Sequence, residues 1–197
     1  DIGQHGFLGC SSLARADLLP DAGSLTVPKE AGQAEMDAAL ERFAYGDAKG
    51  NVFVCSLRDG AKLMSLNAHE LGPGTRMGVR STAFSPDGKT LAVRFDGGAL
   101  VIWRLDTQER IIASGVWATN VVIAGMSFMP DSARVAFSDA DRDRQISVYD
   151  LATAGLLHSA LKVGARTFRF RPGSLQVALA TDNKVDLFDY PAETVLQ

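Results

Sequence analysis

Short apolar runs separated by turn residues dominate the chain from about residue 43 onward. The clearest alternation lies in residues 167–171, where Phe168 and Phe170 are interleaved with Arg169 and Arg171. Successive side chains of a strand point to opposite faces, so we expect the phenylalanines to face a core and the arginines to face away. Most other runs are apolar throughout, which is typical of strands covered on both faces. The pattern predicts an all-β protein.

One phrase, Phe-x-Pro followed by Asp or Gly, recurs along the chain at residues 84–88, 128–132 and 170–174. Its prolines, Pro86, Pro130 and Pro172, are spaced by 130 − 86 = 44 and 172 − 130 = 42 residues. Residues 43–63 also align without a gap with residues 91–111, at an offset of 48. Since proline presets φ and Asp-Gly suits a tight turn, each phrase predicts a strand end followed by a turn.

The unit that begins at Phe84 predicts four strands. A run over residues 90–95 reverses at Asp96-Gly97-Gly98, which is a hairpin signal. A third run ends at Trp103, and a turn leads into a fourth run over residues 109–113. Four short antiparallel strands about every 40 residues are the period of a β-propeller blade.

Residues 33–42 permit two interpretations. They are compatible with an amphipathic helix, but the 48-residue offset places Met36 against Phe84, so a degenerate first strand is equally consistent. Residues 1–40 are expected to be part of a preceding blade or a linker. The blades are then predicted at about 41–68, 69–115, 116–161 and 162–197.

These units resemble the WD-repeat propeller family. The resemblance covers roughly residues 43–197 and rests on Phe-Ser-Pro-Asp-Gly at 84–88, with the aromatic–acid pairs Tyr149-Asp150 and Phe188-Asp189. The family's Trp position is filled by Cys55, Trp103, Tyr149 and Phe188, so the blades are degenerate. The resemblance is to the bacterial-type members of the family. The resemblance implies about four blades, fewer than a complete ring of this family has.

An incomplete ring exposes strand edges and apolar blade faces. We therefore expect either flanking blades or self-association that completes the ring. The N-terminal Asp1 also leads us to expect a segment of a longer protein.

The charge balance adds little to this picture. The 20 Lys and Arg against 23 Asp and Glu leave a net charge of −3, which gives no reason to expect a nucleic-acid or membrane partner. No apolar run is long enough to span a bilayer. The two cysteines make no disulfide framework, and Cys55, inside an apolar run, is expected to be a buried reduced thiol. A cytoplasmic protein is expected.

Residues 139–150 offer one metal hypothesis. Asp139, Asp141 and Asp143 alternate as in a calcium loop, but Arg144 stands where such a loop needs glycine, and Arg142 adds a second positive charge. A lengthened hairpin explains the same residues, so we expect no cofactor. The three histidines show no metal-ligand spacing, and no catalytic signature is present.

Binding at a loop face is the expected activity. By resemblance, the hairpins between second and third strands and the connections between blades lie on one face, which would carry Arg76, Arg80, Trp117, Arg142, Arg144 and Arg166. Arg and Trp often dominate interface energies; the alternative is that Trp117 packs between blades and the arginines are merely solvated. We expect a non-catalytic scaffold that binds protein partners, or else an accessory segment of a larger signalling enzyme such as a bacterial protein kinase.

Overall fold

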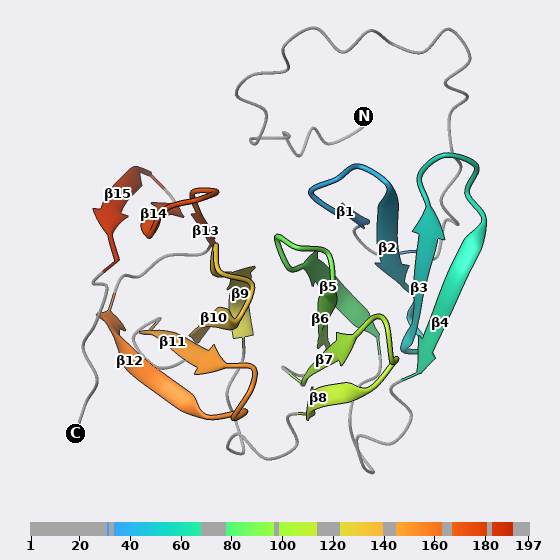
Figure 1. Ribbon diagram of the computed structural model, residues 1–197. Coiled ribbons are helices and arrows are strands. Elements are labelled where there is room, and N and C mark those ends of the chain that lie inside the picture. Colours follow the sequence, from blue (N-terminus) through green and yellow to red (C-terminus); the bar gives the residue numbers. More distant parts are fainter. Residues whose placement is uncertain are drawn as a thin grey trace, which may run out of the picture.

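The computed structural model describes residue 31 and residues 34–67, 78–96, 99–113, 123–139, 145–162, 167–180 and 183–190. These residues form strands joined by turns (Figure 1). No helix in this part of the chain has the length and apolar character needed to cross a membrane.

The strands follow one another along the chain in four groups. In chain order they are β1 (Glu35–Met36), β2 (Arg42–Gly46), β3 (Asn51–Ser56), β4 (Lys62–Asn67), β5 (Val79–Phe84), β6 (Thr90–Phe95), β7 (Leu100–Arg104), β8 (Arg110–Ala113), β9 (Ile123–Phe128), β10 (Arg134–Asp139), β11 (Gln145–Asp150), β12 (Leu156–Lys162), β13 (Thr167–Phe170), β14 (Gln176–Ala180) and β15 (Val185–Asp189).

Each group forms one antiparallel sheet in which every strand pairs with the next. The first three sheets have the orders β1-β2-β3-β4, β5-β6-β7-β8 and β9-β10-β11-β12, and the fourth consists of β13-β14-β15 within the described residues. In Figure 1 the sheets stand side by side in an arc, with β1, β5, β9 and β13 facing its middle. The described sheets form an open arc and no closed ring. The prediction of all-β, four-stranded propeller blades in an incomplete ring is confirmed.

The strand registers reproduce the repeat found in the sequence. The residue that ends each inner strand pairs with the second strand in the same way in all four sheets. These pairs are Met36↔Phe43, Phe84↔Leu91, Phe128↔Val135 and Phe170↔Val177. Residues 35–36 therefore form a degenerate first strand, and the helix interpretation is wrong there. The first sheet begins at Glu35, ahead of the expected boundary at residue 41.

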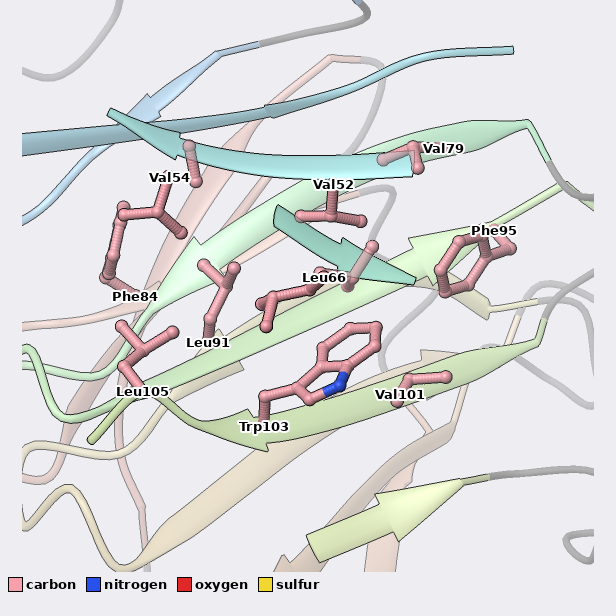
Figure 2. Packing of buried hydrophobic residues seen from close by; sticks show 12 residues of the cluster. Val52, Val54, Leu66, Val79, Phe84, Leu91, Phe95, Val101, Trp103 and Leu105 are labelled. Carbon is pink, nitrogen blue, oxygen red and sulfur yellow. The ribbon is translucent and has the colours of Figure 1, made fainter. Parts of the chain in front are cut away.

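The core lies between the sheets. Figure 2 shows the cluster that joins the first two, where Val52 and Val54 of β3 meet Leu91 of β6 and Trp103 of β7. Each of these side chains is at most 2% exposed. Burying a side chain of the size of Val or Leu contributes about 1.5–3 kcal/mol, so the interfaces between sheets carry much of the stability.

Alternation along the third strands explains why they are apolar on both faces. On β7, Val101 and Trp103 belong to the cluster with the first sheet, whereas Leu100 and Ile102 belong to the cluster with the third sheet. The same logic confirms the alternation predicted for β13, where Phe168 is 1% exposed and the Arg169 side chain 57% exposed. Cys55 is a buried free thiol, as expected.

Candidate interaction face

A β-bulge displays Arg80 at the start of the second sheet. Val79 pairs with Phe95 and Ser81 with Arg94, so Arg80 has no residue opposite it on β6. Bulges re-aim side chains and are frequent beside functional sites. The Arg80 side chain is 68% exposed. A related irregularity follows Ser138 in the third sheet, where Gly125 pairs with Ser138 and Ile123 with Asp139.

Asp96 is the acidic neighbour of Arg80. Its carboxylate lies 3.7 Å from the Arg80 guanidinium, and both side chains are more than two-fifths exposed. The backbone N–H of Asp96 donates to the Gly78 carbonyl (2.7 Å), and a Cβ at Gly78 would collide with the Asp96 carboxylate. Exposed ion pairs contribute about 0–1 kcal/mol, so Asp96 holds Arg80 only weakly. A carboxylate from a partner could replace it at little cost.

Arg94 brings a second guanidinium to this place. Burial lowers the pKa of Arg94, the charge of Arg80 lowers it further, and Asp96 acts in the opposite direction. In the strand register Arg94 lies opposite Ser81, the residue that follows Arg80.

On the neighbouring hairpin of the first sheet, the Asp47 carboxylate is occupied by hydrogen-bond donors of its own turn. One Asp47 carboxylate oxygen accepts from the backbone N–H groups of Lys49 and Asn51 (both 2.9 Å), and the other accepts from Asn51 Nδ2 (2.7 Å). Burial alone would raise the pKa of Asp47, but these donors outweigh it and hold the pKa below 3.8. Asp47 also accepts from the Val79 N–H (3.0 Å) through its carbonyl, so the hairpin supports the start of β5.

A second polar contact joins three sheets at their inner strands. Arg169 of β13 donates from Nη1 to the Met126 carbonyl of β9 (2.8 Å), and its Nη2 lies 4.0 Å from the Glu35 carboxylate of β1. Burial raises the pKa of Glu35, and the charge of Arg169 opposes that shift. The prediction that Arg169 faces away from the core is correct. Its hydrogen bond to Met126 and its ion pair with Glu35 also connect the fourth sheet to the third and first sheets.

The structure pairs Arg80 with Asp96, which the sequence indicated only as a turn residue, and places Arg94 opposite the neighbouring Ser81. The available signal was Arg94 itself, the one charged residue of the strand β6. Asp139 is the last residue of β10. The other predicted binding or metal residues lie outside the described residues and stay predictions: Arg76, Trp117, Asp141, Arg142, Asp143, Arg144 and Arg166. Within the described part of the chain, no group of three or more His, Cys, Asp and Glu residues could hold a metal ion.

No family model and no curated protein matches the chain. The architecture is similar to a solved structure, the crystal structure of the Cps50 (Swd1) beta-propeller domain of Myceliophteria thermophila, with a TM-score of 0.64 and 10% sequence identity. The fold is a β-propeller. The match covers 81% of this chain and 54% of that domain, so the chain spans about half the length of the neighbouring structure. At this identity the likeness concerns the fold alone.

Proposed function

We propose that this chain belongs to a WD-repeat-type propeller that acts as a non-catalytic protein-interaction scaffold. The observation that carries the proposal is the exposed guanidinium of Arg80, displayed at a β-bulge by a stack of packed sheets. Buried clusters pack the sheets against one another, so the backbone that carries Arg80 needs no ordering when a partner binds.

The proposed partner presents an acidic segment. Guanidinium groups bind carboxylates in a bidentate manner, and arginine is enriched among residues that dominate binding energy. The weak contact of Asp96 to Arg80 leaves room for a stronger carboxylate. A role as accessory segment of a larger signalling enzyme remains a prediction from the resemblance, and the flanking gene sequence would test it.

The test uses a fluorescein-labelled hexaglutamate peptide and measures its anisotropy with increasing protein in about 0.1 M salt. Arg80→Glu is expected to weaken binding about tenfold or more, because attraction becomes repulsion. The matched control is Arg104→Glu. Arg104 is also an exposed arginine in a weak ion pair (3.5 Å to Glu109), but it lies at the opposite end of the second sheet, opposite Thr90.

The control should bind hexaglutamate within about twofold of the original chain, since exposed charges separated by more than about 10 Å are screened in salt. Equal weakening by both substitutions would show that only overall charge matters. That result, or no binding to the unsubstituted chain, would overturn the proposed acidic partner.

A further inference from the structure

The position of the Asp96 carboxylate depends on a glycine. One of its oxygens, Oδ2, lies where a side chain at Gly78 would begin, so a Cβ added at Gly78 would collide with it. The other oxygen, Oδ1, lies 3.7 Å from Nε of Arg80. The carboxylate therefore reaches the Arg80 guanidinium through space that only a glycine at position 78 leaves open.

The main chain brings these residues together independently of their side chains. The N–H of Asp96, directly after β6, donates to the carbonyl of Gly78, directly before β5 (2.7 Å). Gly78 has no positive φ, so its backbone conformation is open to other residues. Apart from the Asp96 carboxylate, the nearest atom that an added Cβ would meet in the described chain is the Ala48 carbonyl oxygen, at an ordinary contact distance of 3.7 Å. The glycine thus serves the Asp96 carboxylate.

The contact of Asp96 with Arg80 is reversible. A separation of 3.7 Å exceeds a hydrogen-bond length, so charge alone holds the pair. The Asp96 side chain is 44% exposed and the Arg80 side chain 68%, so the carboxylate can rotate into solvent without uncovering a core. A carboxylate from outside would compete for the same guanidinium and would also be repelled by the charge of Asp96.

We propose that Asp96 is an internal competitor that regulates the binding of carboxylate-bearing partners at Arg80, and that Gly78 makes this competition possible. The inference rests on the proposed function and adds the regulation of its site. The chain's own carboxylate occupies the place of the ligand group and must leave when a partner's carboxylate arrives. The affinity for an acidic segment is therefore lower than Arg80 alone would give.

Two substitutions remove the competitor in different ways, and both are tested with labelled hexaglutamate in about 0.1 M salt. Asp96→Asn removes the charge and should strengthen binding about three- to tenfold, because competition and repulsion both disappear. Gly78→Ala keeps the charge but displaces the carboxylate from Arg80. It should strengthen binding about two- to fivefold, the range expected for loss of an exposed ion pair.

Asp106→Asn is the matched control for net charge. Asp106 is an exposed aspartate in the turn after β7, at the opposite end of the second sheet from Asp96. Its substitution changes the net charge by the same amount and should leave hexaglutamate binding within about 1.5-fold of the original chain. Equal strengthening by Asp96→Asn and Asp106→Asn would overturn the proposal, because net charge would then explain the effect.

Nuclear magnetic resonance of the Arg80 side chain gives a measurement that needs no ligand. The Nε–H signal of Arg80 is identified by its loss in Arg80→Lys. It should shift in both Asp96→Asn and Gly78→Ala and stay in place in Asp106→Asn, because the first two variants take the carboxylate away from Nε. An unchanged signal in Asp96→Asn would overturn the proposal.

The binding results also separate this proposal from the proposed function. If hexaglutamate binds the original chain through Arg80 and neither Asp96→Asn nor Gly78→Ala strengthens it, Asp96 is no competitor and the proposed function stands. If only the two variants bind, the competition is supported in its strongest form. If none of the chains binds, both proposals are overturned.

Discussion

At the residue scale, one position of the repeat keeps its hydrogen-bonding role although the amino acid at that position differs between sheets. In the first sheet Asp37 takes the place that Ser85 has in the second. Asp37 accepts from the backbone N–H groups of Glu41 and Arg42 (2.9 and 3.0 Å) and from Arg42 Nε (2.8 Å). The Ser85 hydroxyl accepts from the Thr90 N–H (2.9 Å). Both side chains satisfy the backbone of a tight turn, so the chemistry recurs although the phrase does not.

Asp37 makes stability depend on pH. Burial alone would raise its pKa, but the donors of Arg42 and Glu41 outweigh burial and hold the pKa below 3.8. A carboxylate with a lowered pKa stabilises the fold above its unfolded pKa, and this contribution is lost as the pH falls through the folded value. We expect Asp37→Asn to reduce the free energy of unfolding by about 1–3 kcal/mol near pH 7, because its buried bonds are charge-assisted.

Urea denaturation between about pH 3 and pH 7 would check this expectation, with the difference between the original chain and Asp37→Asn shrinking below about pH 4. Asp106→Asn, an exposed turn aspartate, serves as the control and should change stability by less than about 0.5 kcal/mol. A difference that stays constant over the whole pH range would contradict the role given to Asp37.

At the scale of elements, the turns after the inner strands link neighbouring sheets. Arg42 Nη2 donates to the Gly88 carbonyl (2.8 Å), and the Ser132 hydroxyl accepts from the Asp87 N–H (3.0 Å). Gly88 has a φ of +68°, and the equivalent position in the first sheet is Leu40 at +56°. Leucine is unfavourable at positive φ, but the turn holds one at this position. The first turn therefore lacks the glycine that marks the equivalent turn of the second sheet. For this reason the sequence left residues 33–42 open between a helix and a strand.

Substitutions at two glycines distinguish the free-energy cost of backbone strain in such a turn from the cost of disturbing a contact between sheets. Gly173 has a φ of +70°, and no heavy atom of the described chain lies within 4 Å of a Cβ added there. A Cβ at Gly88 would instead press on Arg42 Nη2. We expect Gly173→Ala to cost about 1–2 kcal/mol from backbone strain and Gly88→Ala to cost clearly more. Thermal unfolding of both variants measures the difference; equal costs would mean that the Arg42 contact does not link the sheets.

At the scale of the whole molecule, stability comes from faces that meet only when successive sheets stack. Leu91 and Trp103 lie in one sheet, but they are buried because Val52 and Val54 of another sheet cover them (Figure 2). Position by position, the same strand pattern is fully covered in the first three sheets and open in the fourth. Burial here depends on the place of a sheet in the arc and not on its own sequence.

Equivalent substitutions in the second and fourth sheets should therefore differ sharply. Ile102→Glu places a charge in a position that is fully buried, and we expect a loss of more than about 3 kcal/mol or failure to fold. Leu187→Glu places it on an open face and should change stability by less than about 0.5 kcal/mol. Urea denaturation of both variants decides the matter. Similar losses would mean that the Leu187 face is already covered in the isolated chain.

The sequence by itself determined the strands and their period. The phrase around Pro86, the hairpin signal after Phe95 and the offset of 48 residues predicted β6, its partners and the equivalence of Phe43 with Leu91, because turn residues and apolar runs act locally. Of the residues that the proposed function uses, the sequence had indicated Arg80.

The tertiary structure alone decided which residues join Arg80 and which faces are covered. Arg80 lies at a bulge that shifts the register of β5 against β6 by one residue, and the Asp96 carboxylate lies 3.7 Å from it. Local composition does not specify such a shift. Arg169 meets Glu35 across more than a hundred residues of sequence only because the sheets curve into an arc. Val185 and Leu187 have the composition of a buried strand and are exposed, since burial requires a neighbour that a strand's own sequence does not contain.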